Sequence, residues 1–136
     1  MADATATQLS QERRDYLRLA LLPGLGPKMM AALLSQFGSA GEILTARYSA
    51  LSEVPRVGER LANAIRSASD SPLLDQVLEH CQQHQVRILL PGDDEFPQLL
   101  QELPTPPLYL FIRGTFTAAD QLSIAIVGTR HATHYG

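Results

Sequence analysis

Apolar residues in the first half of the chain recur every three or four positions, which is the spacing of amphipathic helices. Short polar or proline- and glycine-containing segments separate these stretches and supply helix ends. The pattern predicts helices over residues 8–22, 28–37, 40–44, 48–51 and 59–67. We therefore expect residues 1–70 to form an all-helical domain, near the lower size limit for independent folding.

The pattern changes after Ser69-Asp70-Ser71-Pro72, which is expected to end this domain and to cap a helix. We predict that this helix covers 73–84, that a helical turn covers 96–103, and that the proline-rich segment 104–107 is an extended linker. Continuous apolar runs predict strands over 86–90, 108–112 and 122–127. In the last of them, Ser123 to Val127 reads as buried on both faces, so residues 71–136 are expected to open an α/β sheet.

One segment of the helical half occurs twice. Residues 22–31 (LPGLGPKMMA) resemble residues 54–63 (VPRVGERLAN), so that Gly26 recurs as Gly58 32 residues later, each time before a helix. This repeat predicts a pair of helix-hairpin-helix units. In such a unit glycine permits the tight turn, and the exposed N–H groups with the next helix N-terminus can hold a DNA phosphate without reading bases.

The candidate phosphate contacts in the hairpins are Gly24, Gly26 and Lys28 in the first copy and Gly58 in the second. Arg56 stands where the second copy would have its first glycine, which argues against a phosphate-ready turn there. The alternative interpretation is that both hairpins merely connect helices. It is favoured by the charge of residues 1–70, whose lysines and arginines exceed their acids by only one.

A second candidate phosphate site lies near the end of the sequence. The predicted strand runs into Gly128-Thr129-Arg130, which combines a glycine that allows close backbone approach, a hydroxyl and a guanidinium. The alternative is an ordinary turn with an exposed arginine. Since the net charge is −3, any nucleic acid would be held by placed backbone groups and a few arginines rather than by a broad basic face.

The sequence offers little support for a metal site or a reactive cysteine. The pairs His131/His134 and His80/His84 lack further metal ligands, and Cys81 within a helical pattern reads as an inert thiol. The sequence predicts no catalytic residue, no metal and no cofactor. It also shows no membrane span and no secretory signal, so a cytoplasmic location is expected.

Three ordered motifs carry a family resemblance: DEFPQLL at 94–100, TPPLYLFIRG at 105–114 and AIVGTRHATHYG at 125–136. With the helical half ahead of them, they make the chain similar to the DprA/Smf (DNA-processing protein A) family. Its pattern is Asp-x-Tyr-Pro-x-x-Leu, then Pro-Pro-x-x-Leu-Tyr-x-x-Gly, then a strand entering Gly-Ser/Thr-Arg and ending in Tyr-Gly. Phe96 replaces the usual tyrosine, and Leu108-Tyr109 is slightly shifted.

The resemblance implies an N-terminal SAM-like, helix-hairpin-helix-related domain followed by the first strands of a truncated Rossmann-like domain. It implies a non-enzymatic binder of single-stranded DNA that acts in natural transformation, protects incoming DNA and loads a RecA-type recombinase. By position it assigns DNA backbone contacts to Gly128, Thr129 and Arg130. The family's other DNA contacts and its homodimer surface have no counterpart here, so we expect weak DNA binding by these 136 residues.

Two rival functions are compatible with the residues. One is a nucleotide-processing Rossmann enzyme of the phosphoribohydrolase type, which would need a downstream Pro-Gly-Gly-x-Gly-Thr loop and a catalytic glutamate. The other is a helical module that docks a protein and binds no DNA.

Overall fold

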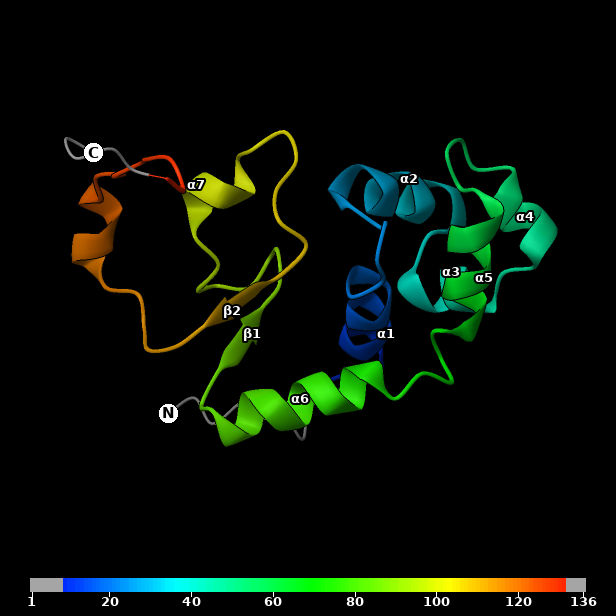
Figure 1. Ribbon diagram of the computed structural model, residues 1–136, viewed down its shortest axis with the longest axis horizontal. Coiled ribbons are helices and arrows are strands. Elements are labelled where there is room, and N and C mark those ends of the chain that lie inside the picture. Colours follow the sequence, from blue (N-terminus) through cyan, green and yellow to red (C-terminus); the bar gives the residue numbers. More distant parts are fainter. Residues whose placement is uncertain (1–8, 132–136) are drawn as a thin grey trace.

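The computed structural model describes residues 9–131 and shows a cluster of helices joined to a small two-stranded sheet (Figure 1). The helices of the first half are α1 (Gln11–Ala20), α2 (Pro27–Phe37), α3 (Ala40–Thr45), α4 (Tyr48–Ser52) and α5 (Glu59–Ser67). The second half contains α6 (Leu73–Gln83), β1 (Arg87–Leu89), α7 (Gln98–Gln101), β2 (Leu110–Ile112) and the 3-10 helix η2 (Ala118–Leu122). Each helix predicted from the apolar spacing is present.

Local capping explains where these helices begin and end. Ser10 caps α1, because its hydroxyl accepts a hydrogen bond from the backbone N–H of Arg13. Pro27 opens α2, where its missing N–H costs nothing, and Gly38 ends α2 with a φ of 91° that favours glycine. Ser39 then caps α3 through the backbone N–H of Glu42.

The first hydrophobic core lies among α1 to α5. Its most deeply buried side chains come from five different elements, and all of them are fully excluded from solvent: Leu19, Leu33, Ile43, Leu51 and Ile65. Burial of such side chains stabilises the fold by about 1.5–3 kcal/mol each, before the conformational entropy that opposes it. These short helices are therefore held by a shared core, since helices of this length are marginal alone.

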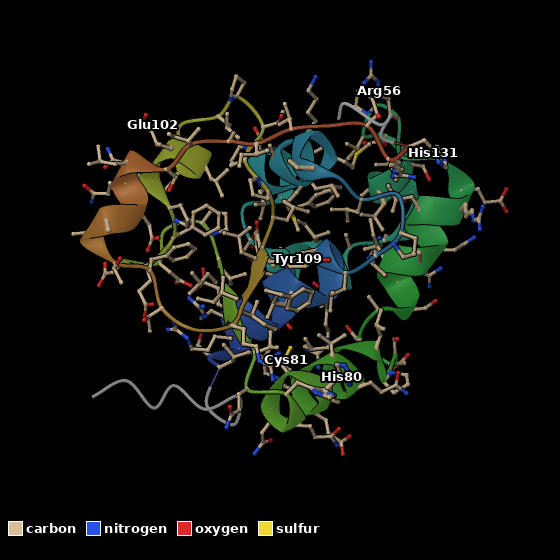
Figure 2. All side chains as sticks on the ribbon, turned by 60° about the vertical axis from the view of Figure 1, so that its left-hand side comes forward. Arg56, His80, Cys81, Glu102, Tyr109 and His131 are labelled. Atoms are coloured by element: carbon tan, nitrogen blue, oxygen red, sulfur yellow. The ribbon has the colours of Figure 1, made fainter. Side chains whose placement is uncertain are left out.

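A second, smaller core lies on the other face of α1. It consists of Leu17 of α1, Leu74 and Leu78 of α6, and Leu90, which follows β1. Tyr109 is partly buried and packs against both cores, and it lies near the centre of the molecule in Figure 2. Consequently α1 belongs to both hydrophobic clusters, and the second half of the chain packs directly onto the helical half.

The sheet consists of β1 and β2, which pair antiparallel with Ile88 opposite Phe111. Between them the chain passes through α7 and the proline-containing segment 104–107, which is neither helix nor strand. The strands predicted over 86–90 and 108–112 are thus present in shortened form. No parallel strand pair is found between residues 9 and 131, so the Rossmann-like arrangement is not seen there.

The third predicted strand is wrong for this structure. After η2 the segment 123–127 is neither helix nor strand, pairs with no strand among the described residues, and is exposed to solvent. Ile126 is 97% exposed and Val127 is 90% exposed, where the sequence predicted burial on both faces. The physical reason is that a strand needs a neighbour for its backbone N–H and C=O groups, whatever its side chains prefer.

Ion pairs fasten the second half of the chain to α1. The Arg13 guanidinium donates to both carboxylate oxygens of Asp93, and Asp93 also accepts from the backbone N–H of Leu90 at 2.8 Å. The next residue along α1, Arg14, pairs with Asp75 of α6 at 2.6 Å. None of the helices between residues 9 and 131 has the length and apolar character needed to cross a bilayer.

We expect Asp93→Asn to reduce the free energy of unfolding at pH 7 by about 1 kcal/mol, because the half-exposed pair is partly screened by solvent. The hydrogen bond from Arg13 lowers the pKa of Asp93, so its contribution is present above the unfolded-state pKa of about 3.9 and is lost as the pH falls toward the lower folded value. Urea denaturation between pH 7 and pH 3 should therefore show wild type and variant converging in acid. Asp94→Asn, an exposed neighbour, is the control; an equal loss in both variants would contradict this account.

Candidate nucleic-acid interface

The two predicted hairpins adopt the same backbone turn. In the first, the N–H of Leu25 donates to the carbonyl of Leu22 at 3.2 Å; in the second, Val57 donates to Val54 at 3.0 Å. The third residue of each turn has a positive φ, 87° at Gly24 and 71° at Arg56. The internal repeat seen in the sequence is therefore a repeat in three dimensions.

The second glycine of each hairpin begins a helix. Gly26 and Gly58 are extended N-cap residues of α2 and α5, and their carbonyls accept from Met30 and Ala62 at 2.9 and 3.0 Å. A Cβ placed at either glycine, or at Gly24, would meet no atom within 4 Å. The hairpin backbone thus faces open space next to N–H groups that helices leave without an internal acceptor.

Arg56 forms the turn of the second hairpin in the left-handed conformation that Gly24 adopts in the first. The sequence argued against a phosphate-ready turn at Arg56, and that expectation stays a prediction. For a residue with a Cβ this conformation costs about 1–2 kcal/mol, which the surrounding fold must outweigh. Burial of Val54 and Val57 on either side of Arg56 supplies that constraint, since both are at least 94% buried.

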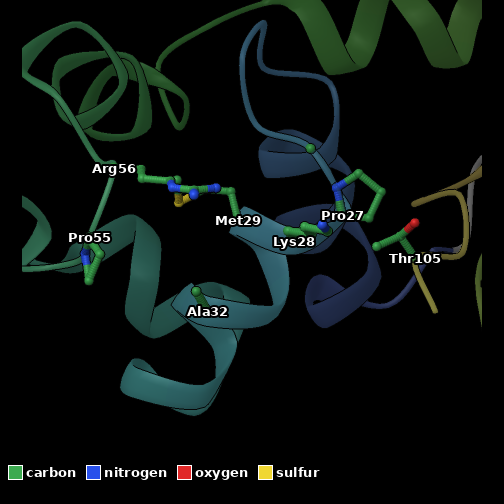
Figure 3. Close-up of a pocket in the computed structure, with 8 residues that line it drawn as sticks. Pro27, Lys28, Met29, Ala32, Pro55, Arg56 and Thr105 are labelled. Carbon is green, nitrogen blue, oxygen red and sulfur yellow. The ribbon is translucent and has the colours of Figure 1, made fainter.

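A groove of about 590 Å³ separates the two hairpins (Figure 3). It is lined by eight residues from the first hairpin, α2, the second hairpin and the 104–107 segment: Gly26, Pro27, Lys28, Met29, Ala32, Pro55, Arg56 and Thr105. The two charged residues of this lining are both cations, one at each side of the groove. Three predicted contacts thus lie at or next to one feature, namely Gly24, Gly26 and Lys28, while Gly58 lies two residues beyond Arg56.

Two groups of cations can be distinguished by whether they form a salt bridge. The arginines of α1 and β1 are all engaged in ion pairs with Asp or Glu: Arg13, Arg14, Arg18 and Arg87. By contrast, the cations between residues 27 and 66 form no salt bridge with any described residue: Lys28, Arg47, Arg56, Arg60 and Arg66. Charge on the hairpin half is therefore available to an external anion.

The structure places Gly128, Thr129 and Arg130 on the exposed segment that follows η2. The hydroxyl of Thr129 donates to the carbonyl of His131 at 2.9 Å, and Arg130 forms no salt bridge within residues 9–131. None of the three lines the groove between the hairpins. The two candidate phosphate sites are thus separate features of the described chain, and the Tyr-Gly end of the motif lies outside the described residues.

The remaining candidates have little chemistry. Cys81 is buried in α6, and burial raises the pKa of its thiol, which suits an inert side chain. His80 and His84 have ring centroids 4.3 Å apart, but no group of three or more metal-ligating side chains is found in residues 9–131. His131 is exposed in that range, and His134 lies outside the described residues.

Sequence reasoning missed part of the groove. Arg56 aligns with Gly24 in the repeat, so the alignment itself offered a signal for its place in the turn. Pro55 is likewise the counterpart of Pro23. Thr105 carries no such signal, because only the folding of the linker against the helical half brings it to this groove.

Comparisons with known proteins agree with this arrangement. Residues 16–69 match the family model described as SAM-like helix-hairpin-helix tandem, and residues 87–136 match the model described as DNA recombination-mediator protein A. Protein Smf of Synechocystis sp. is 30% identical over 131 residues, which cover 93% of this chain and 33% of Smf. No solved structure matched.

Shorter matches concern UvrABC system protein C. The protein of Renibacterium salmoninarum is 42% identical over 64 residues, or 45% of this chain and 10% of the relative. That of Thermobifida fusca is 48% identical over 44 residues, or 32% of this chain and 7% of the relative. This chain therefore spans about a third of the Smf relative and a tenth or less of these two.

Fold and comparisons first define a class: a tandem of helix-hairpin-helix units followed by a recombination-mediator segment. The order of the two matched models and the alignment along nearly the whole chain support the assignment of this chain to the DprA/Smf family.

The left-handed conformation of the two turns allows a prediction about the free energy of unfolding. Gly24→Ala should lower the free energy of unfolding by about 1 kcal/mol, because alanine is strained at a φ of 87° even though its Cβ would meet no atom. Arg56→Ala is the matched control at the equivalent position; it exchanges one strained side chain for another and should change stability little. Urea denaturation of both variants measures the difference, and equal losses would refute the equivalence of the two turns.

Proposed function

We propose that this chain is part of a DNA-processing protein that binds single-stranded DNA during recombination. The observation that carries the proposal is the match of residues 87–136 to the recombination-mediator model, a range that includes the exposed Gly128-Thr129-Arg130 segment. The unpaired cations of the helical half support it, since they leave positive charge for a phosphate backbone.

In this proposal the phosphate contacts come from backbone and guanidinium groups together. The N–H groups of Gly128 and Thr129 would approach the strand closely, and the Arg130 guanidinium would grip a phosphate with two parallel hydrogen bonds. Such contacts hold the backbone without reading bases, which fits a protein that must accept any incoming sequence. The hairpin residues Gly24, Gly26, Lys28 and Gly58 would add further phosphate contacts.

The proposal extends to the architecture of the longer protein. We infer that residues 1–70 form the SAM-like domain and that residues 71–136 begin a Rossmann-like domain. In a protein of the length of the Smf relative, the exposed apolar run 122–127 would gain the ladder partners that it lacks among the described residues. Hydrogen bonding of its backbone to a neighbouring strand is what would turn that run into a strand.

The partners follow from the family resemblance. We infer that the parent protein acts without catalysis in natural transformation, delivers the strand to a RecA-type recombinase and forms a homodimer through residues outside this chain. No arrangement of side chains in residues 9–131 favours the rival phosphoribohydrolase-type enzyme.

The role of Arg130 can be tested on the chain itself. We expect an isotope-labelled chain titrated with oligo-dT at low salt to show amide shift changes at Gly128 and Thr129, with weak overall affinity. Arg130→Ala should abolish these changes, because the guanidinium supplies the charged half of the contact.

Arg113→Ala is the control, since Arg113 is also exposed and forms no salt bridge with a described residue. It should leave the shifts at Gly128 and Thr129 unchanged. Identical titrations of the wild type and the Arg130 variant, or no shift at Gly128 and Thr129 at any oligo-dT concentration, would count against the loop as a DNA site. Tight binding that Arg130→Ala abolishes would contradict the expected weakness.

A further inference from the structure

We propose that the groove between the two hairpins is a second site for single-stranded DNA, with Arg56 as the residue that positions the strand. This inference rests on the proposed function, in which the loop at residues 128–130 binds DNA. It adds a second site with its own lining residues, among them Arg56, Met29, Pro55 and Thr105. It concerns the helical half, whereas the contacts carried over from the family lie near the end of the chain.

The charges that line the groove favour an anionic ligand. Lys28 and Arg56 lie on opposite sides of the groove, and the lining contains no aspartate or glutamate. Neither cation forms a salt bridge with a described residue. In Figure 3 the Arg56 side chain points from the second hairpin toward Met29 on α2, so its charge is directed over the groove rather than away from it. The groove therefore complements an anionic ligand.

The rest of the lining selects the form of nucleic acid. Between the two cations the groove is lined by Pro27, Met29 and Pro55, whose surfaces are apolar. A duplex keeps its base faces inside the stack and offers such surfaces little to contact. An unpaired strand exposes both base faces and sugars, and its binding sites typically combine cations with apolar or aromatic surfaces. The groove lacks aromatic side chains, so the expected binding is weak and independent of sequence.

The strained backbone conformation of Arg56 also favours a ligand contact in the groove. Glycine would occupy this turn without strain, as Gly24 does in the first hairpin, yet an arginine is held at a φ of 71°. The side chain thus adds nothing that the turn requires, and it lowers the stability of the turn. Its presence over the groove is explained if the guanidinium contacts a ligand, because strained residues persist where the side chain has such a task.

Thr105 connects the groove to the second half of the chain. It lies in the linker between α7 and β2, where Pro104, Pro106 and Pro107 restrict the backbone. Thr105 is exposed and lines the groove, so a ligand there would contact this side chain. A strand in the groove would therefore contact both halves of the chain.

The test is a titration of the 136-residue chain with oligo-dT, read at the amides of Gly26, Met29, Arg56 and Thr105. We expect shifts at these positions, and in Arg56→Gly an apparent Kd raised about three- to fivefold. The slope of log K against log salt should fall by about 0.7, the value for one phosphate contact on a single strand. Arg56→Gly should also keep or raise the thermal midpoint, because glycine relieves the strain, so weaker binding could not be attributed to unfolding.

Two controls isolate the guanidinium. Arg66→Ala removes a cation that forms no salt bridge with a described residue and does not line the groove, and it should leave the Kd and the shifts unchanged. Arg56→Lys retains charge on the strained turn and should bind more tightly than Arg56→Gly.

Several outcomes would overturn the proposal. Oligo-dT that shifts only residues 128–130, with Arg56→Gly equal to wild type, would reject the groove and leave the proposed function standing. Groove shifts without any shift at Gly128 and Thr129 would instead support the groove and reject the loop. A duplex of the same length that produces equal or larger groove shifts would reject the preference for a single strand, and no groove shift with any DNA would reject the site.

Discussion

The packing of α1 between two hydrophobic clusters is the constraint on which the rest of the structure depends. Leu19 and Ala20 face the core of the helical half, whereas Leu17 faces α6 and Leu90. A ten-residue helix would be marginal in isolation, so its stability comes from both contacts at once. The bidentate pair between Arg13 and Asp93 adds a further link between α1 and the second half of the chain.

This constraint also shapes the groove. Leu108 and Tyr109 pack against the helical core, which holds the end of the proline-containing linker close to the helices. That contact brings Thr105 to the groove between the hairpins, although Thr105 and Lys28 are far apart in sequence. The groove therefore results from the attachment of the second half, and a helical half without the linker would lack one of its lining residues.

Much of the helical half could be predicted from sequence because its signals are local. Apolar spacing predicts the helices. Their ends are marked by residues that lie at or beside them in the sequence: Ser10, Pro27 and Gly38. Arg56 could not be predicted in the same way. Whether a side chain tolerates a left-handed turn depends on the buried neighbours Val54 and Val57, and that information is tertiary. The strand predicted over the apolar run 122–127 was wrong for a related reason. Apolar composition indicates that a segment could be buried in a sheet, but it does not show whether a partner strand lies beside it.

The candidate site shows the same division between local and tertiary information. The repeat located Gly26 and Gly58 at two helix starts, but it could not show that one groove lies between the hairpins. The net charge of −3 said still less about the site, because a sum over the chain does not distinguish cations that are paired with carboxylates from cations that are not. Arginines of α1 and β1 are paired with carboxylates, and two of these pairs, Arg13–Asp93 and Arg14–Asp75, attach the two halves to each other. Cations near the hairpins form no salt bridge with a described residue, so a chain with a net negative charge still carries positive charge there that no described carboxylate pairs with.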